Sequence, residues 1–261
     1  MAISEIQGID VSHHNGQINW ERVARAGKKF AILKCQYESL PHHIDETFEY
    51  NYENAKKCGL AVGVYIFIGR GSMLDMQSDI ESLLAHLGGR KLEYGIWIDL
   101  ESENLRAKGK VYIKGLVETY KKAFNDAGYY VGIYCNRDWY LNVIHSDLKA
   151  MNDFWIARYP KNDYGEYNPN SSLKPSGTMA VAWQYSSKGS VSGIKTPVDL
   201  DVDYDGVINL ARPDRKTNAE IAAEVLEGKW GTKYSRPSRK QLLTAAGYDY
   251  NTIQYLVNKM C

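Results

Sequence analysis

Short apolar runs alternate with amphipathic stretches along the first 160 residues of the chain. Apolar runs of about four to eight residues between turn signals are typical of buried strands, and apolar positions spaced three or four apart are typical of helices. The apolar runs predict strands at residues 7–12, 30–36, 61–68, 94–101, 130–136 and 153–159. The amphipathic stretches predict helices near residues 20–27, 45–58, 74–87, 110–127 and 137–144.

The pattern changes after residue 160. A polar loop at 161–177 precedes two further apolar runs, 179–186 and 198–204, with no helical stretch between them. Strand–helix alternation implies parallel strands with right-handed crossovers. Eight strands and about five helices therefore predict an α/β fold, an irregular (β/α)8-like barrel that gathers the carboxyl ends of its strands on one face, where active sites lie.

Two carboxylic acids end the fourth predicted strand. Asp99 and Glu101 follow the apolar run 94–98, and residues two apart in a strand face the same side. Side-by-side carboxyl groups raise each other's pKa, which is costly for stability and useful for acid–base catalysis. For an isolated Asp-x-Glu triplet, two solvated acids at an ordinary strand end are the alternative.

Acids also stand in the first and last predicted strands. Asp10 closes the run that begins at residue 7, and Asp199, Asp201 and Asp203 alternate with apolar residues, so these three share one strand face. The ends of separate strands converge when a barrel closes. We therefore expect these acids to meet Asp99 and Glu101 at one rim.

Composition narrows the class of protein. The 261 residues suffice for one large domain plus a small one, and the net charge of +1 favours neither a nucleic-acid partner nor membrane insertion. No apolar run approaches the roughly 18 residues of a membrane span. The 20 tyrosines offer flat apolar faces with a polar handle, which suit sugar rings.

The four cysteines lack CxxC spacing, and Cys35 and Cys135 lie in strand runs, so we expect buried thiols in a reducing compartment rather than a disulfide framework. The histidines lack the spacing of metal ligands, so no metal site and no cofactor are predicted.

The last 45 residues differ from the rest. Residues 213–216 are polar and contain a proline, as in a linker, which divides the chain into residues 1–212 and 217–261. Helical patterns begin near residues 217, 237 and 250, and Ile221, Val225 and Leu226 mark the first of them. The second part is therefore predicted to be a small three-helix unit.

Three motifs closely resemble those of glycoside hydrolase family 25, the lysozymes (N-acetylmuramidases) of phages and bacteria. Residues 8–16 are similar to the family's opening motif, 97–101 to its central acid pair, and 183–185 with 198–200 to its closing motifs. The resemblance covers residues 1–210 and implies a barrel of five β/α units and three final strands. It also implies cleavage of the β-1,4 bond between N-acetylmuramic acid and N-acetylglucosamine in bacterial peptidoglycan.

The resemblance implies a role for each acid. Glu101 would be the general acid, and Asp99 would orient the substrate's N-acetyl group or stabilise the cationic transition state. Asp10 and Asp199 would hold the acid pair in its charge state and position the substrate, with Asp201 as the alternative fourth acid and a candidate substrate contact. The candidate sugar-contacting aromatic residues, for which core packing is the alternative, are Tyr65, Tyr134, Trp155, Tyr159 and Trp183.

Residues 217–261 resemble the short helical repeat that follows the catalytic domain in some phage lysozymes and binds cell wall without choline. The resemblance implies that Arg239 contacts a muropeptide; a helix-surface arginine is the alternative. A single copy binds weakly without help from the catalytic domain.

A phage endolysin that stays in the host cytoplasm until it reaches the wall fits the start at Met1, where no export signal is visible. A chitinase-like glycosidase and a catalytically silent wall-binding protein are the competing classes. Direct attack by water and attack by the substrate's own N-acetyl group both stay open, and the oligomeric state is not predicted.

Overall fold

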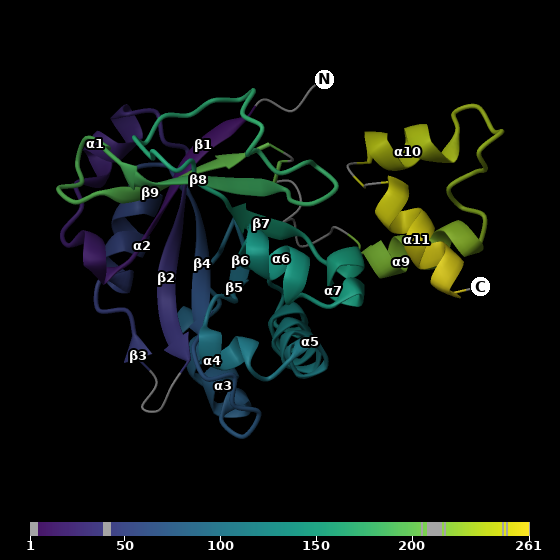
Figure 1. Cartoon of the computed structure of the whole chain (residues 1–261), viewed down its shortest axis with the longest axis horizontal. Coiled ribbons are helices and arrows are strands. Elements are labelled where there is room, and N and C mark those ends of the chain that lie inside the picture. Colours follow the sequence, from purple (N-terminus) through teal and green to yellow (C-terminus); the bar gives the residue numbers. More distant parts are fainter. Residues whose placement is uncertain are drawn as a thin grey trace.

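The computed structural model describes residues 5–38, 43–204, 206–207, 216, 218–246, 248 and 250–260 (Figure 1). Within these residues eight strands form a closed barrel, and a short additional strand, β3 (His43–Ile44), pairs with β2. The barrel strands are β1 (Ile6–Val11), β2 (Phe30–Glu38), β4 (Ala61–Ile68), β5 (Ile96–Asp99), β6 (Val131–Asn136), β7 (Phe154–Ala157), β8 (Ala182–Gly189) and β9 (Val198–Asp203). All eight were predicted, and the barrel fold is confirmed.

Helices cover the outside of the barrel (Figure 1). The predicted ones are α1 (Trp20–Arg25), α2 (Phe48–Lys57), α3 (Met76–Leu87), α5 (Lys110–Asp126) and α6 (Arg137–Asn142). The sequence pattern did not predict the short elements η1 (His13–Asn15), α4 (Glu103–Arg106) and α7 (Ser146–Met151). Each of these has six residues or fewer, so it holds few apolar positions from which a helical repeat could be recognised; α1 and α6 are as short but were predicted within longer stretches.

The direction of β9 decides which end of the barrel its acids reach. Neighbouring barrel strands from β1 through β8 are parallel, whereas β9 runs antiparallel to both β8 and β1. In this register Asp199 lies opposite Asp10, and Asp203 lies opposite Ile6. The start of β9 is therefore at the rim where the parallel strands end, and its last residue is at the opposite end.

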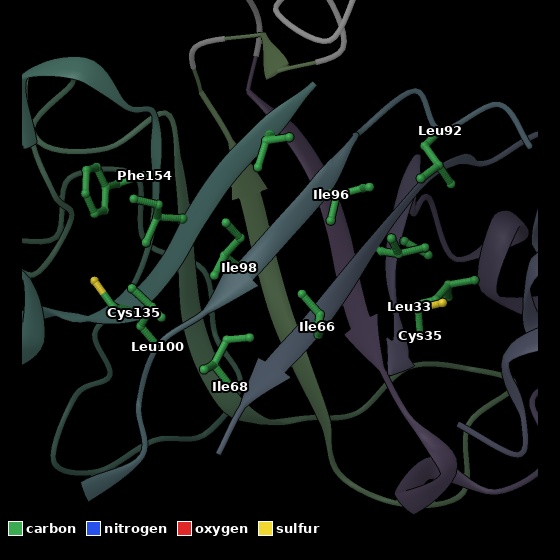
Figure 2. Close-up of a cluster of buried hydrophobic side chains, with 14 of the residues drawn as sticks. Leu33, Cys35, Ile66, Ile68, Leu92, Ile96, Ile98, Leu100, Cys135 and Phe154 are labelled. Atoms are coloured by element: carbon green, nitrogen blue, oxygen red, sulfur yellow. The ribbon is translucent and has the colours of Figure 1, made fainter. Parts of the chain in front are cut away.

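Alternate residues of each strand face either the helices or the barrel interior. On β5, Ile96 and Ile98 belong to the large cluster between strands and helices, part of which is drawn in Figure 2. Trp97 belongs to a second cluster, inside the barrel, together with Phe30 and Trp155. Asp99, two residues after Trp97, therefore lies on the interior face at the end of β5.

Three helices form the C-terminal module: α9 (Asn218–Leu226), α10 (Arg239–Ala245) and α11 (Tyr250–Met260). They share a small apolar core, and α11 lies beside α7, where Lys259 pairs with Asp147 (Figure 1). The three predicted helices are thus present. Most of the predicted linker, residues 213–215, lies outside the described residues, so the proposed domain boundaries stay predictions.

Cys35 and Cys135 are buried free thiols, as predicted, and Cys261 lies outside the described residues. Within the described part of the chain, no helix is both long and apolar enough to cross a membrane.

Candidate active site

A cleft of about 200 Å³ opens at the rim where the parallel strands end. It is lined by residues from seven strands or from the loops directly after them, namely Asp10, Tyr65, Asp99, Glu101, Tyr134, Trp155, Tyr159, Gln184 and Asp199. The structure thus brings together the four acids that the sequence pattern placed at separate strand ends. Barrel closure with an antiparallel β9 is what makes them neighbours.

The acid pair combines a buried and an exposed group. Asp99 is almost fully buried at the end of β5, whereas Glu101, two residues later, is exposed at the cleft. Ser102 donates a hydrogen bond through its hydroxyl to the carbonyl of Gly69 (2.6 Å), which ties the segment after Glu101 to the end of β4. Glu101 therefore lines the cleft on a segment that this hydrogen bond fixes to the barrel.

Burial raises the pKa of both acids. For Asp99 the loss of hydration is the largest cause, and the nearby Glu101 carboxylate adds to it. Although Glu101 is open to the cleft, the protein around it removes part of its hydration and so raises its pKa, and the Lys34 ammonium opposes that rise. Two neighbouring carboxyl groups in such a site retain a proton more readily than either does in water. The arrangement can therefore supply a protonated carboxyl group to a reacting oxygen.

Lys34 was not predicted as a site residue. It lies on β2, with its Nζ 5.6 Å from the centroid of the Tyr37 ring and 5.7 Å from that of Phe67. A charged residue in the middle of the apolar run 30–36 was the available signal. Its charge favours the ionised forms of Asp99 and Glu101 and so limits the rise of both pKa values.

Gln184 is a second residue that the sequence reasoning missed. Its Nε2 donates to Asp10 Oδ2 (2.6 Å), and its Oε1 accepts hydrogen bonds from the hydroxyls of Tyr134 (2.8 Å) and Tyr159. An uncharged polar residue within the apolar run 179–186 was the signal. One side chain therefore orients three residues that line the cleft.

The structure separates Asp199 from Asp201. Asp199 lines the cleft, and burial with the nearby Glu101 raises its pKa to about 6. Asp201 is completely buried below the cleft, where its Oδ1 accepts a hydrogen bond from Trp155 Nε1 (2.9 Å), and burial with Asp199 raises its pKa to about 8. The prediction that Asp201 contacts substrate is therefore corrected, because Asp201 lies one layer deeper than the cleft surface.

Four of the five predicted aromatic contacts line the cleft: Tyr65, Tyr134, Trp155 and Tyr159. Trp183 does not. It packs in the outer cluster, where its Nε1 donates to the carbonyl of Arg158 (2.9 Å). Successive strand residues face opposite sides, so an inward Gln184 places Trp183 outward, and Trp183 is withdrawn as a sugar contact.

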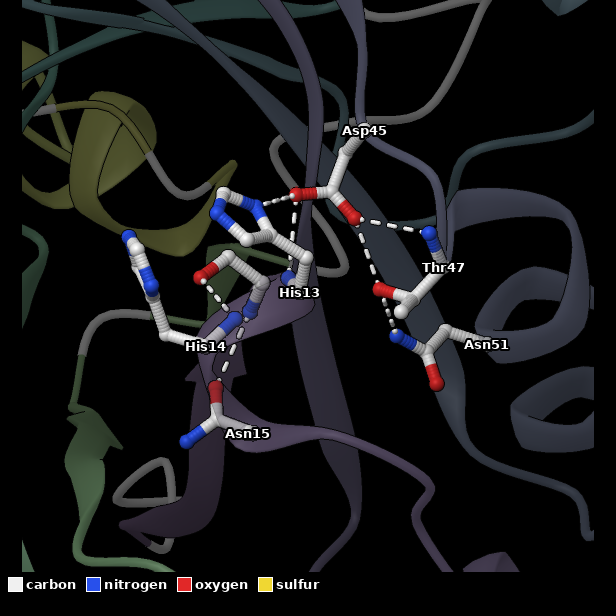
Figure 3. Close-up of polar contacts among 7 residues, drawn as sticks. His13, His14, Asn15, Asp45, Thr47 and Asn51 are labelled. Carbon is white, nitrogen blue, oxygen red and sulfur yellow. Dashed lines mark hydrogen bonds and ion pairs between the residues drawn. The ribbon is translucent and has the colours of Figure 1, made fainter.

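The loop after β1 is held by a buried carboxylate (Figure 3). Asp45 accepts hydrogen bonds from His13 Nδ1 (2.7 Å) and the His13 backbone N–H (3.0 Å). It also accepts from the hydroxyl (2.6 Å) and the backbone N–H (3.0 Å) of Thr47. Burial alone would raise the pKa of Asp45, but these hydrogen bonds outweigh burial and lower it. The segment that follows Asp10 is therefore anchored.

Arg239 is bound within its own module. Its Nε and Nη2 donate to the carbonyl of Gly231 (3.0 and 2.9 Å), and its Nη1 donates to Gln254 Oε1 (3.2 Å). The guanidinium thus joins the start of α10 to α11 and the preceding turn. Its contact with cell wall stays a prediction.

The chain is similar to known proteins. The model of glycosyl hydrolases family 25 matches residues 9–194, and that of the CW_7 repeat matches residues 219–261. The autolytic lysozyme of Clostridium acetobutylicum is 27% identical over 203 residues, and lysozyme M1 of Streptomyces globisporus is 28% identical over 211. These alignments cover 78% and 75% of this chain but only 57% and 67% of the two relatives.

The crystal structure of the CTP1L endolysin has a TM-score of 0.62 and 19% identity, with 98% of each chain covered, and so shares the fold. The family model spans well over half of the chain, and the cleft lies within the barrel that it describes. The chain belongs to glycosyl hydrolases family 25.

Proposed function

We propose that this protein is a lysozyme that cuts the β-1,4 bond between N-acetylmuramic acid and N-acetylglucosamine in bacterial peptidoglycan. The observation that carries the proposal is the cleft shared by Asp10, Asp99, Glu101 and Asp199, with Glu101 exposed and its pKa raised. Glycoside cleavage needs a protonated acid at the leaving oxygen and negative charge near the developing oxocarbenium ion. Family membership and two lysozyme relatives support the same chemistry.

In the proposed reaction, Glu101 transfers its proton to the leaving glycosidic oxygen. The acetamido oxygen of N-acetylmuramic acid attacks C1 of the same sugar, while Asp99 orients that acetamido group. Water then opens the cyclic intermediate at C1 and returns a proton to Glu101. Asp199 supplies negative charge beside the cationic sugar, where a preorganised charge is most effective, and Asp10 helps to position the substrate.

We propose further that the C-terminal module binds cell wall and that the protein acts as a phage endolysin. The match of residues 219–261 to the CW_7 repeat supports wall binding, and the endolysin with the same fold over its full length supports the biological role. Release from the host cytoplasm to the wall belongs to this proposal.

Digestion of purified peptidoglycan by the full chain tests the cleavage, with mass spectrometry of the new reducing ends. We expect N-acetylmuramic acid at each new end. Glu101→Gln should lower the rate by about 10²- to 10⁴-fold, the usual contribution of a general acid. Glu103→Gln is the matched control, since Glu103 is also exposed and lies just beyond the cleft in α4.

Three results would contradict the proposal. Near-normal release of muropeptides by a folded Glu101→Gln protein would reject the assigned acid. Faster cleavage of chitin than of peptidoglycan would favour a chitinase-like enzyme, and wall binding without any product would favour a silent binder. The anomeric configuration of the fresh product, read by proton NMR, tests the attack by the acetamido group, which predicts retention.

A further inference from the structure

Asp201 is a buried acid that the proposed reaction does not use. It lies in the middle of β9, paired in register with Gly8 of β1 and Gln184 of β8, and its side chain is fully buried. Its Oδ1 accepts from Trp155 Nε1, whereas its Oδ2 has no hydrogen-bond donor among the described residues. An ionised carboxylate with one oxygen unpaired in a protein interior is costly.

The Asp10 carboxyl group is the acid nearest to hydrogen bonding with Asp201. The two side chains are within hydrogen-bonding reach of each other, and Asp10 uses its Oδ2 to accept from Gln184. Two ionised carboxylates cannot bond to each other, because both only accept. A single proton between them satisfies Asp201 and leaves the pair with one negative charge, as in other closely spaced carboxyl dyads.

The other titratable groups that influence Asp201 come from every neighbouring strand. They are Asp10, Asp199, Lys28, Tyr94, Tyr159 and Tyr185. Asp199 raises the pKa of Asp201, and the Lys28 ammonium lowers it. Burial raises the pKa of Tyr94, Tyr159 and Tyr185 above the ordinary value, so these phenols stay neutral while the carboxyl pair titrates. The protonation of Asp201 is thus set chiefly by its burial, and the negative charge of Asp199 adds to that effect.

We propose that Asp10 and Asp201 share one proton, and that Asp201 is a positioning residue which holds Asp10 in its catalytic orientation until that proton is lost at alkaline pH. The part that concerns catalysis rests on the proposed lysozyme function. The sharing of the proton does not rest on that function, because it follows from the contacts of the folded protein.

Proton sharing has a direct consequence for stability. The pKa of Asp201 is about 8 in the folded protein because of burial and Asp199, against about 3.9 for an unfolded aspartic acid. Between these values the folded chain holds more protons than the unfolded chain, so stability falls as the pH rises. The decline reaches its end once the pH passes the folded-state pKa.

Thermal unfolding of the full chain from about pH 5 to about pH 9 tests this inference. In Asp201→Asn the amide donates to Asp10 at every pH, and its oxygen still accepts from Trp155. We expect the wild-type Tm to fall across this range and to fall less in Asp201→Asn, where Asp99, Glu101 and Asp199, whose pKa values burial also raises, keep part of the decline. The matched control is Asp203→Asn, a change of the next buried acid on the same face of β9, and it should keep the wild-type slope. An unchanged slope in Asp201→Asn would overturn the inference.

Turnover on peptidoglycan tests the positioning role. Asp201→Leu keeps a side chain branched at Cγ but forms no hydrogen bond to Asp10 or Trp155, so kcat should fall about 10- to 100-fold with a smaller change in KM. Asp201→Asn should recover most of that loss. A folded Asp201→Leu protein with wild-type kcat, or an asparagine variant no better than the leucine one, would refute the role. Failure of the proposed function would appear separately, as a wild-type protein with no activity on peptidoglycan.

Discussion

Replacing Gln184 with leucine removes the side chain that joins three cleft residues. Gln184 is 2% exposed, donates to Asp10 and accepts from Tyr134 and Tyr159. Tyr159 is 37% exposed and can bond to water instead, whereas Asp10 and Tyr134 are 6% and 8% exposed and cannot easily do so. Each buried polar atom that loses its hydrogen bond to Gln184 costs about 1–3 kcal/mol. Gln184→Leu should therefore lower the free energy of unfolding by about 2–6 kcal/mol.

Gln36 offers a matched control on the outer side of the barrel. It is also fully buried in a strand, but its Nε2 makes a single bond, to the backbone carbonyl of Asp79 (3.1 Å), and its Oε1 has no partner in the described part of the chain. Leucine at this position removes an unsatisfied oxygen together with one hydrogen bond. We expect Gln36→Leu to stay within about 1 kcal/mol of the wild type.

Urea unfolding of both variants, followed by tryptophan fluorescence, gives the two free energies. Hydrolysis of peptidoglycan by the folded proteins should fall in Gln184→Leu and not in Gln36→Leu, because only Gln184 orients residues of the cleft. If Gln184→Leu lost no more stability than Gln36→Leu, the network around Gln184 would not have the energetic weight assigned to it.

Three further changes test other parts of the molecule. Asp45→Asn should destabilise the protein by about 1–3 kcal/mol at pH 7. The loss should be smaller at pH 3, since hydrogen bonds from Thr47 lower the pKa of Asp45 against the effect of burial, and stability from a lowered pKa disappears as the pH falls through it; thermal unfolding at both pH values measures this. Gly132→Ala should cost about 1–3 kcal/mol or more by urea unfolding, because the new Cβ would lie 2.3 Å from the buried Trp97 ring. A chain of residues 1–212 should retain hydrolysis but sediment less with cell walls, and equal sedimentation would argue against a binding module.

The barrel strands were predictable because most are buried on both faces. Such strands read as nearly continuous apolar runs, and the predicted strand 61–68 coincides with β4. The predicted strand 94–101 was too long at both ends, since β5 covers only Ile96–Asp99. Its polar end leaves the sheet to form the cleft.

Strand direction and facing were harder to predict. Alternation showed that Asp199, Asp201 and Asp203 share a face, but it carries no information on which end of the strand lies at the rim. The antiparallel pairing of β9 settles that point in favour of Asp199. Alternation also could not tell whether Trp183 or Gln184 faces inward, and the aromatic residue was the wrong choice.

The acids inside the barrel differ in how many hydrogen-bond donors their carboxyl oxygens have. At the end far from the cleft, Asp203 accepts from Tyr94 and from the backbone N–H groups of Gly206 and Val207. Asp201, one layer up, accepts from Trp155 through one oxygen, and its other oxygen, like one oxygen of Asp99 at the cleft, has no donor among the described residues.

The number of hydrogen-bond donors to these acids therefore falls from the end of the barrel far from the cleft toward the cleft. A structural acid needs a full set of donors, because an unpaired buried charge destabilises the fold. An acid that must keep or exchange a proton needs fewer donors, because each donor to its ionised form lowers its pKa. The gradient places carboxyl groups with raised pKa values toward the cleft, and the packed, hydrogen-bonded layers beneath offset the cost of leaving these groups with few donors.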